Sequence, residues 1–188
     1  VEEALGVELS DRIKYIRTIM DELQRIDSHL LFYSCCGQDL GALTAFIYGM
    51  RDREEVLNVM EETTGGRLIQ NYYRIGGCQE DIDVNLVENV KKLCKYLKPK
   101  FKEYHDILSS NRIFMNRFKG VGVLSKEDAI SYGCTGGTGR ATGWANDVRK
   151  HHPYAMYDKV EFDEITFTHG DSYDRYLVRM AELEQSVR

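Results

Sequence analysis

The side chains that could do chemistry include a glycine-rich segment whose backbone could hold an anion. Residues 133–143 read GCTGGTGRATG, and glycines let backbone N–H groups approach an anion closely. The lysine of a P-loop is missing, and Thr142 breaks the G-x-G-x-x-G pattern of dinucleotide sites. The segment therefore predicts a tight, closely packed loop, with a functional loop at an interface as the alternative.

Histidines and carboxylates are the second group of candidates. His151 and His152 have no companion ligands at helical or hairpin spacing, so they predict no metal site. His29 lies in a predicted helix, where we expect a partly buried, hydrogen-bonded imidazole, with a proton relay as the alternative. Asp39 follows Gly37 and is expected to cap the start of the next helix.

Composition sets the class of protein. The 188 residues are 43% hydrophobic and 29% charged, which suits one compact domain, and the net charge of −5 argues against a nucleic-acid-binding surface. Apolar runs are far shorter than the roughly 18 residues of a membrane span. The five cysteines include no C-x-x-C pair, which indicates reduced thiols that pack in the core.

Helical periodicity dominates the chain. Apolar residues recur every three or four positions over 13–30, 40–60, 86–108 and 176–187, which predicts amphipathic helices. Ser10 suits the first helix start, Gly37 predicts a break, and Gly65 should end the second helix. Pro99 should interrupt the third helix.

The later part of the chain contains a predicted capping box and a small predicted β element. Ser125 with Asp128 predicts the start of a short helix, and Asp171 or Ser172 should begin the last one. Partial alternation predicts a strand pair near 159–168. The last helix has no stop signal, so we expect a fragment of a longer chain. Residues 1–188 are expected to form one mainly α-helical domain.

Several blocks resemble one family, the 49 kDa or D-type subunit of respiratory complex I (NADH:quinone oxidoreductase). The resemblance spans nearly the whole chain, which would be a central fragment of about half the family's length. The matching blocks are IRTIMDELQRIDSHL at 16–30, QDLGALTAF at 38–46, TGGRLIQNYYRIGG at 64–77, TGGTGRATG at 135–143 with DVRK at 147–150, and GDSYDRYLVR at 170–179.

The resemblance implies a helical bundle similar to the large subunit of nickel-iron hydrogenases. In the family this subunit binds no metal itself. With the B-type subunit of complex I, which ligates the terminal 4Fe–4S cluster, it forms the pocket where quinone, the substrate, is reduced, and this drives proton pumping. The implied partners are the B-type and C-type subunits and the membrane arm, at the cytoplasmic side of the bacterial inner membrane. The isolated fragment is expected to be inactive.

The resemblance also assigns roles to residues. Asp39 matches the aspartate that pairs with the quinone-binding histidine, which lies in the family's N-terminal part. Arg67 and Arg74 match arginines near the cluster-bearing subunit, and His29 is assigned to the same pocket. Ile69 stands where the family often has a histidine linked to proton uptake. The predicted interface loop comprises Gly136, Gly137, Arg140, Asp147 and Arg149.

Two other classes of protein remain as alternatives. One is the large subunit of a membrane-bound nickel-iron hydrogenase, whose metal cysteines would lie outside this segment. The block 147–150 with Tyr154 resembles complex I and favours quinone chemistry. The other is a non-catalytic helical scaffold. The native electron donor, NADH or another carrier, stays open.

Overall fold

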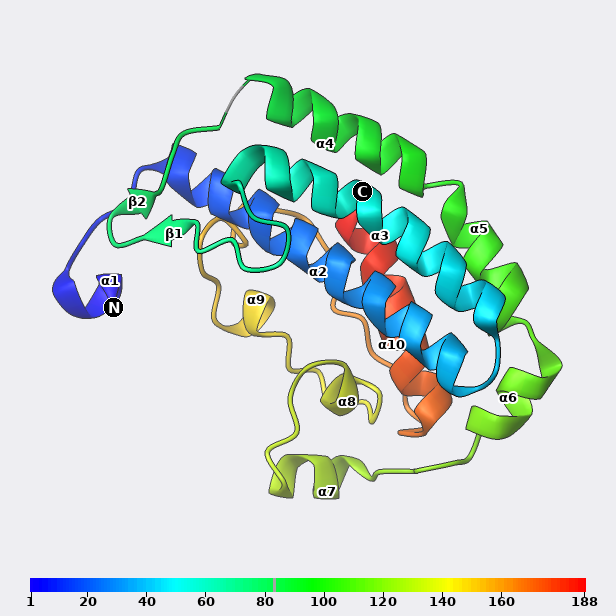
Figure 1. Cartoon of the computed structure of the whole chain (residues 1–188). Coiled ribbons are helices and arrows are strands. Elements are labelled where there is room, and N and C mark those ends of the chain that lie inside the picture. The colour runs from blue at the N-terminus through cyan, green and yellow to red at the C-terminus, as the bar shows by residue number, and fades with distance from the viewer. Residues whose placement is uncertain (83) are drawn as a thin grey trace.

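The computed structural model describes residues 1–82 and 84–188 as helices joined by loops, with one short β-hairpin (Figure 1). The prediction of a mainly helical fold is confirmed. In chain order the elements are α1 Glu2–Leu5, α2 Asp11–Asp39, α3 Leu43–Thr64, β1 Tyr73–Arg74, β2 Gly77–Cys78, α4 Val84–Leu97, α5 Lys100–Tyr104, the π-helical turn η1 His105–Ser109, α6 Arg112–Phe118, α7 Lys126–Ser131, α8 Gly136–Arg140, α9 Val148–His151 and α10 Ser172–Ser186.

The centre of the fold is the antiparallel pair α2 and α3. Their buried apolar faces, with Leu30 and Met60 among the fully enclosed side chains, form most of the core. The two helices come close at Gly49, where a Cβ would lie 2.2 Å from Ser34 Oγ. A glycine is therefore required there, because any side chain would push α2 and α3 apart.

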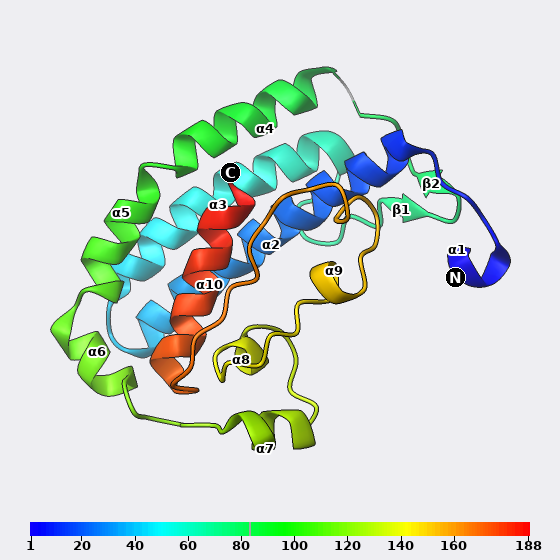
Figure 2. The same ribbon diagram turned by 180° about the vertical axis from the view of Figure 1, so that it is seen from behind.

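Two further layers cover this pair. Helices α4 and α5 run along the outer side of α3, and α10 crosses the opposite face (Figure 2). As predicted, Pro99 lies at an interruption, because α4 ends at Leu97 and α5 begins at Lys100. The predicted caps at Ser10, Ser125 and Asp171 are also confirmed, since each side chain accepts a hydrogen bond from the backbone three residues ahead.

The predicted break at Gly37 is wrong, and so is the helix start at Asp39. Helix α2 continues through Gly37 and ends at Asp39, and α3 begins at Leu43 after a turn. Gly37 serves packing instead, because a Cβ there would lie 2.7 Å from Ala45 Cβ. Asp39 is therefore the last residue of a helix and does not cap the next one.

The predicted strands near 159–168 are also wrong. This segment is irregular, and the hairpin pairs Tyr73 with Cys78 and Arg74 with Gly77 instead. Residues 159–168 bond to helices: Phe167 N donates to Arg140 O at 3.0 Å, and Gln185 Nε2 donates to Asp163 O at 2.8 Å. This segment therefore lies against helices α8 and α10, and among the described residues its backbone has no neighbouring strand with which to pair.

The cysteines fulfil the core-packing prediction only in part. Cys36 is buried, whereas the adjacent Cys35 is exposed, and both are free thiols. In the part of the chain that the structure describes, no helix has the length and apolar character needed to cross a membrane.

Candidate functional site

Polar side chains recur at helical spacing on the facing sides of α2 and α10. Together with Phe32 and Cys36, which share the α2 face, they form a set that we call the polar seam. The spacing of three or four residues places each group on one face of its helix. The polar seam comprises Glu22, Arg25, His29, Phe32, Cys36 and Asp39 of α2, and Arg175, Arg179, Glu182 and Ser186 of α10.

The centre of the seam is a buried carboxylate that joins three elements. Glu182 is 2% exposed and accepts from His29 Nε2 at 2.9 Å. Arg140, at the end of α8, donates to the other oxygen through Nε at 3.0 Å and through Nη2. Burial alone would raise the pKa of Glu182, but His29 and Arg140 outweigh it and the pKa is lowered. Glu182 is therefore an anion with both oxygens paired.

His29 in this cluster is a satisfied, partly buried histidine, as expected from the sequence. Burial lowers its pKa, although the neighbouring Glu182 carboxylate acts in the opposite direction. The neutral imidazole then carries its proton on Nε2, because that atom faces a carboxylate. The assigned role of His29 in a quinone pocket stays a prediction.

A second cluster lies at the other end of the seam. Glu22 accepts from Arg149 Nη1 at 3.0 Å and from the Tyr157 hydroxyl at 2.6 Å. Arg149 is 5% exposed and also binds both carboxylate oxygens of Asp147, at 3.1 and 2.7 Å. Ser186 of α10 donates to the other oxygen of Glu22 at 2.5 Å. These bonds hold the segment 147–157 against α2 and α10.

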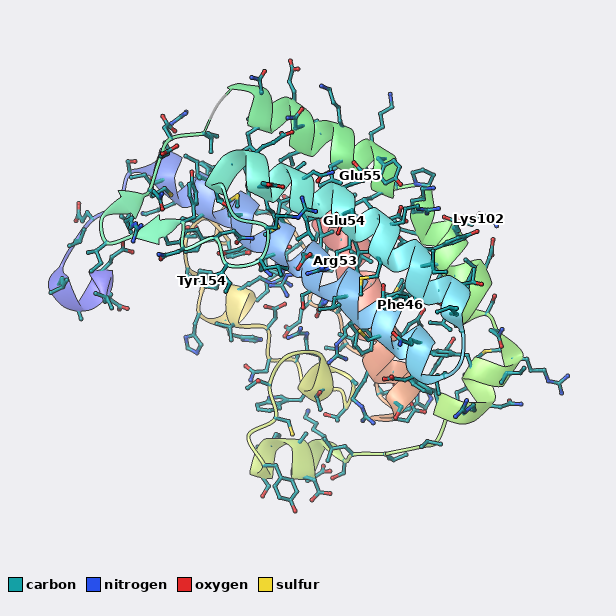
Figure 3. All side chains as sticks on the ribbon, in the orientation of Figure 1. Phe46, Arg53, Glu54, Glu55, Lys102 and Tyr154 are labelled. Carbon is teal, nitrogen blue, oxygen red and sulfur yellow. The ribbon has the colours of Figure 1, made fainter. Side chains whose placement is uncertain are left out.

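Tyr154 belongs to the same segment and lies beside α9, as Figure 3 shows. Its ring packs edge-on against Tyr157 with 4.9 Å between the ring centroids.

Two of the residues assigned to an interface loop, Arg140 and Arg149, make ion pairs within the chain, and both are buried. They fix the loop to the bundle, and a role at a subunit interface stays a prediction.

The glycines of the predicted loop allow close packing, as expected. Gly136 has φ +62°, a left-handed conformation that favours glycine. Gly137 presses against α10, where a Cβ would lie 3.4 Å from Val178 Cγ1 and 3.5 Å from Arg179 Nη1. The backbone of α8 can therefore lie directly on α10.

The seam opens at its Asp39 end into a cleft of about 460 Å³, which we call the terminal cleft. Asp39 is exposed there, and its negative charge adds to burial in raising the pKa of Cys36 to about 11. The cleft thus offers one carboxylate, two guanidinium groups and aromatic surface. Its lining includes Phe32, Cys35, Asp39, Thr138, Arg175 and Arg179.

The two arginines assigned to the cluster-facing loop lie elsewhere. Arg67 pairs with Glu54 and Glu61 of α3, and the carbonyl of Arg74 accepts from Arg17 of α2 at 2.9 Å. From Arg17 to Asp39 the helix rises roughly 33 Å. The structure therefore does not bring Arg74 and Asp39 into one site within this chain.

The most buried member of the seam was missed in the sequence. Glu182 looks like one of many acidic residues on a helix surface. The sequence does contain a signal, because Arg175, Arg179, Glu182 and Ser186 recur at spacings of four, three and four and so share one helix face.

Among residues 1–82 and 84–188, no group of three His, Cys, Asp or Glu side chains is arranged to hold a metal ion.

Comparisons with known proteins agree with each other. A sequence model of the family described as "Respiratory-chain NADH dehydrogenase, 49 Kd subunit" matches residues 39–188. The C/D-type subunit of the NADH-quinone oxidoreductase of Phocaeicola vulgatus is 64% identical over 187 residues, which cover all of this chain and 36% of that protein. The D-type subunit of the Bacillus cytotoxicus enzyme is 42% identical over 188 residues and 51% of its length.

A solved structure is similar along almost the whole chain. It is that of the membrane-bound sulfane sulfur reductase, described as an archaeal respiratory membrane complex, with a TM-score of 0.93 and 36% identity. The match covers 97% of this chain and 49% of that one. The chain thus spans between about a third and a half of the relatives it matches.

Proposed function

Because this chain belongs to the family of the 49 kDa subunit of respiratory-chain NADH dehydrogenase, we propose that it works in an NADH:quinone oxidoreductase and forms part of the quinone-reducing pocket. The terminal cleft carries the proposal, because Asp39 is exposed in it at the open end of a seam whose carboxylates Glu22 and Glu182 are paired within the chain. Curated relatives named as subunits of NADH-quinone oxidoreductase, at 42–64% identity, support the substrate class.

In this proposal the chain supplies the wall of a pocket that a second protein of the complex completes. That partner, the B-type subunit, would hold the terminal 4Fe–4S cluster, which delivers electrons to the quinone. Asp39 would pair with a histidine from the N-terminal part of the full-length protein and hold that imidazole in one tautomer. The chain would lie in the peripheral arm of the complex, on the cytoplasmic side of the bacterial inner membrane, and this arm would be joined to a membrane arm that pumps protons.

The chemistry of the cleft suits a neutral ring with two polar ends. Phe32 offers an aromatic face, and Arg179 offers a donor to one quinone oxygen. Asp39 accepts only, so it would act through the histidine that it holds, which would donate to the other quinone oxygen. Such a lining can orient a quinone headgroup between hydrogen-bonding groups, while the long apolar tail leaves through the open side. The buried pair between Glu182 and Arg140 keeps the cleft walls in place, because it joins α10 to α8.

The test is Asp39→Asn in the assembled complex. Asp39 is exposed at a helix end, so the substitution should leave assembly intact, while it removes the charge that favours an imidazolium. We expect quinone reductase turnover to fall about tenfold or more, with unchanged electron transfer from NADH to an artificial acceptor upstream of the quinone. The exposed Asp106→Asn on η1 is the matched control.

A second candidate concerns the acceptor. The membrane-bound sulfane sulfur reductase contains a chain of this fold at 36% identity. The name of that complex indicates sulfane sulfur, not quinone, as the electron acceptor. Turnover with polysulfide but not with quinone would favour that function. Hydrogen oxidation by the full complex would instead establish the hydrogenase alternative, and unchanged quinone turnover in Asp39→Asn would favour a scaffold role.

A further inference from the structure

Arg179 differs from Arg140 and Arg149, the two buried arginines that are paired with carboxylates of the polar seam. It lies on α10 one turn before Glu182, where the seam meets the terminal cleft. Arg140 pairs with Glu182, and Arg149 pairs with Asp147 and Glu22. Within residues 1–82 and 84–188, no carboxylate oxygen lies within 4.0 Å of the Arg179 guanidinium.

The Arg179 side chain is nevertheless held in a fixed position. Its Nη1 donates to the Arg175 carbonyl at 2.7 Å, and its Cζ lies 4.5 Å from the centroid of the Phe32 ring. Gly137 of α8 covers it from another side with backbone alone. Stacking on an aromatic face and a fixed hydrogen bond orient the planar guanidinium before any ligand arrives.

Burial without a counter-ion makes this cation unusual. A partly buried charge loses hydration that no anion replaces here. Burial is the main cause that lowers the pKa of Arg179, the charges of Arg175 and Arg140 act the same way, and the charge of Glu182 opposes them. The site is therefore preorganised for an anionic oxygen that enters the cleft.

Arg175 lines the same cleft but has little left to offer a ligand. Its Nη1 donates to the Gly170 carbonyl at 2.8 Å, and its Nη2 donates to the Gly122 carbonyl at 2.9 Å and to Ser172 Oγ at 3.0 Å. These bonds tie the start of α10 to the loop before α7. Arg179, with one bond to protein, keeps N–H groups free for the cleft.

We propose that Arg179 binds the quinone oxygen on which negative charge collects during reduction, an inference that rests on the function proposed above. Two electrons from the partner's iron–sulfur cluster and two protons, drawn from solvent through the pocket, convert each quinone to a quinol. No bond between heavy atoms breaks. Arg179 keeps its proton throughout, and its interaction strengthens as the oxygen becomes an anion, so it stabilises the transition state more than the bound quinone.

The experiment uses the intact complex with Arg179→Gln and Arg179→Lys. We expect Arg179→Gln to lower kcat for quinone on the order of a hundredfold while KM changes less than about threefold, since the neutral quinone gains little from the charge. Arg179→Lys keeps the charge but loses the planar stack on Phe32, so it should restore part of kcat. Arg112→Gln, an exposed change of the same charge on α6, is the control and should match the native enzyme.

Electron transfer from NADH to an upstream artificial acceptor reports assembly in every variant. A loss of that activity in parallel with quinone turnover would overturn the proposal and make Arg179 a structural residue, paired with a carboxylate of another part of the complex. A rise in KM with unchanged kcat would also overturn it. If Asp39→Asn impairs quinone turnover but Arg179→Gln does not, this inference fails while the proposed function stands. If neither variant affects quinone turnover, both fail.

Discussion

His29 and Glu182 are 153 residues apart in the sequence, yet their Nε2 and Oε2 atoms lie 2.9 Å apart. The contact joins the middle of α2 to the last helix, and Arg140 extends it to α8 through the second oxygen. One carboxylate thus fixes the relative positions of α2, α8 and α10, three of the elements that border the terminal cleft.

We predict that Glu182→Ala destabilises the chain by about 3 kcal/mol, because it leaves the Arg140 guanidinium buried without an anion. Urea denaturation of the 188-residue chain measures this. Glu184→Ala is the matched control, since Glu184 pairs with a partly exposed His105 and should contribute less than about 1 kcal/mol. Equal losses in the two variants would show that the buried pair has no special role.

The features that could be predicted correctly are those that depend only on residues close in the sequence. The caps at Ser10 and Asp171 and the interruption at Pro99 follow from local backbone chemistry, and the structure confirms them. Gly37 was misread because a glycine can break a helix or let another helix approach. Only the position of Ala45 decides between the two, and that position depends on the tertiary fold.

The site was predictable only in part, for the same reason. Glu22, Arg25 and His29 recur at helical spacing on one face of α2, but nothing in the sequence pairs that face with α10. The segment 159–168 alternates as a strand would, but its neighbours are helices, so its backbone bonds to Arg140 and Gln185. The roles assigned to Asp39, Arg67 and Arg74 depend on proteins outside this chain and stay predictions.

We predict that His29 makes the chain less stable in mild acid. Burial lowers its pKa in the folded state, with Arg25 and Arg179 acting in the same direction and Glu182 opposing them. The unfolded chain therefore binds a proton near pH 6.5 that the folded chain takes up only at lower pH. Stability falls below about pH 6.5, by at most about 1.4 kcal/mol for each pH unit.

The variant His29→Gln can still donate to Glu182 but cannot titrate, so it should lose this part of the pH dependence. Urea midpoints at about pH 5.5 and 7.5 compare it with the native chain, and His152→Gln, an exposed histidine change, is the control. Glu182 itself has a lowered pKa, so its contribution is lost only below its ordinary range. An unchanged slope in His29→Gln would show that another group causes the dependence.

We predict that Gly49→Ala costs about 1–3 kcal/mol by overpacking the α2–α3 contact. The added Cβ would lie 2.2 Å from Ser34 Oγ and 2.9 Å from the Tyr33 ring. Thermal denaturation measures the loss. Adding Ser34→Ala removes the nearest atom, so the double variant should be more stable than the sum of the two single losses. Strict additivity would mean that the helices separate freely and that Ser34 is not the obstacle.

Ile69 leads to a prediction about the partner's cluster, provided that the proposed function holds. The side chain is 90% exposed on the loop between α3 and β1, and it cannot exchange a proton. A histidine there would take up a proton when the cluster gains an electron, so the midpoint potential would fall with rising pH. We expect a flat dependence in the native complex and a slope approaching about 59 mV per pH unit in Ile69→His.

Potentiometric titration of the cluster by EPR over about pH 6 to 8, where an ordinary histidine titrates, makes the comparison. Ile113→His is the matched control, because Ile113 is also exposed, at 70%, but lies on α6 beyond the Asp39 end of α2. It should leave the potential independent of pH. A steep slope in the native complex would mean that another group, such as His29, supplies the proton. A flat line in Ile69→His would place this loop away from the cluster, because a histidine charge that the cluster does not sense cannot couple to its reduction.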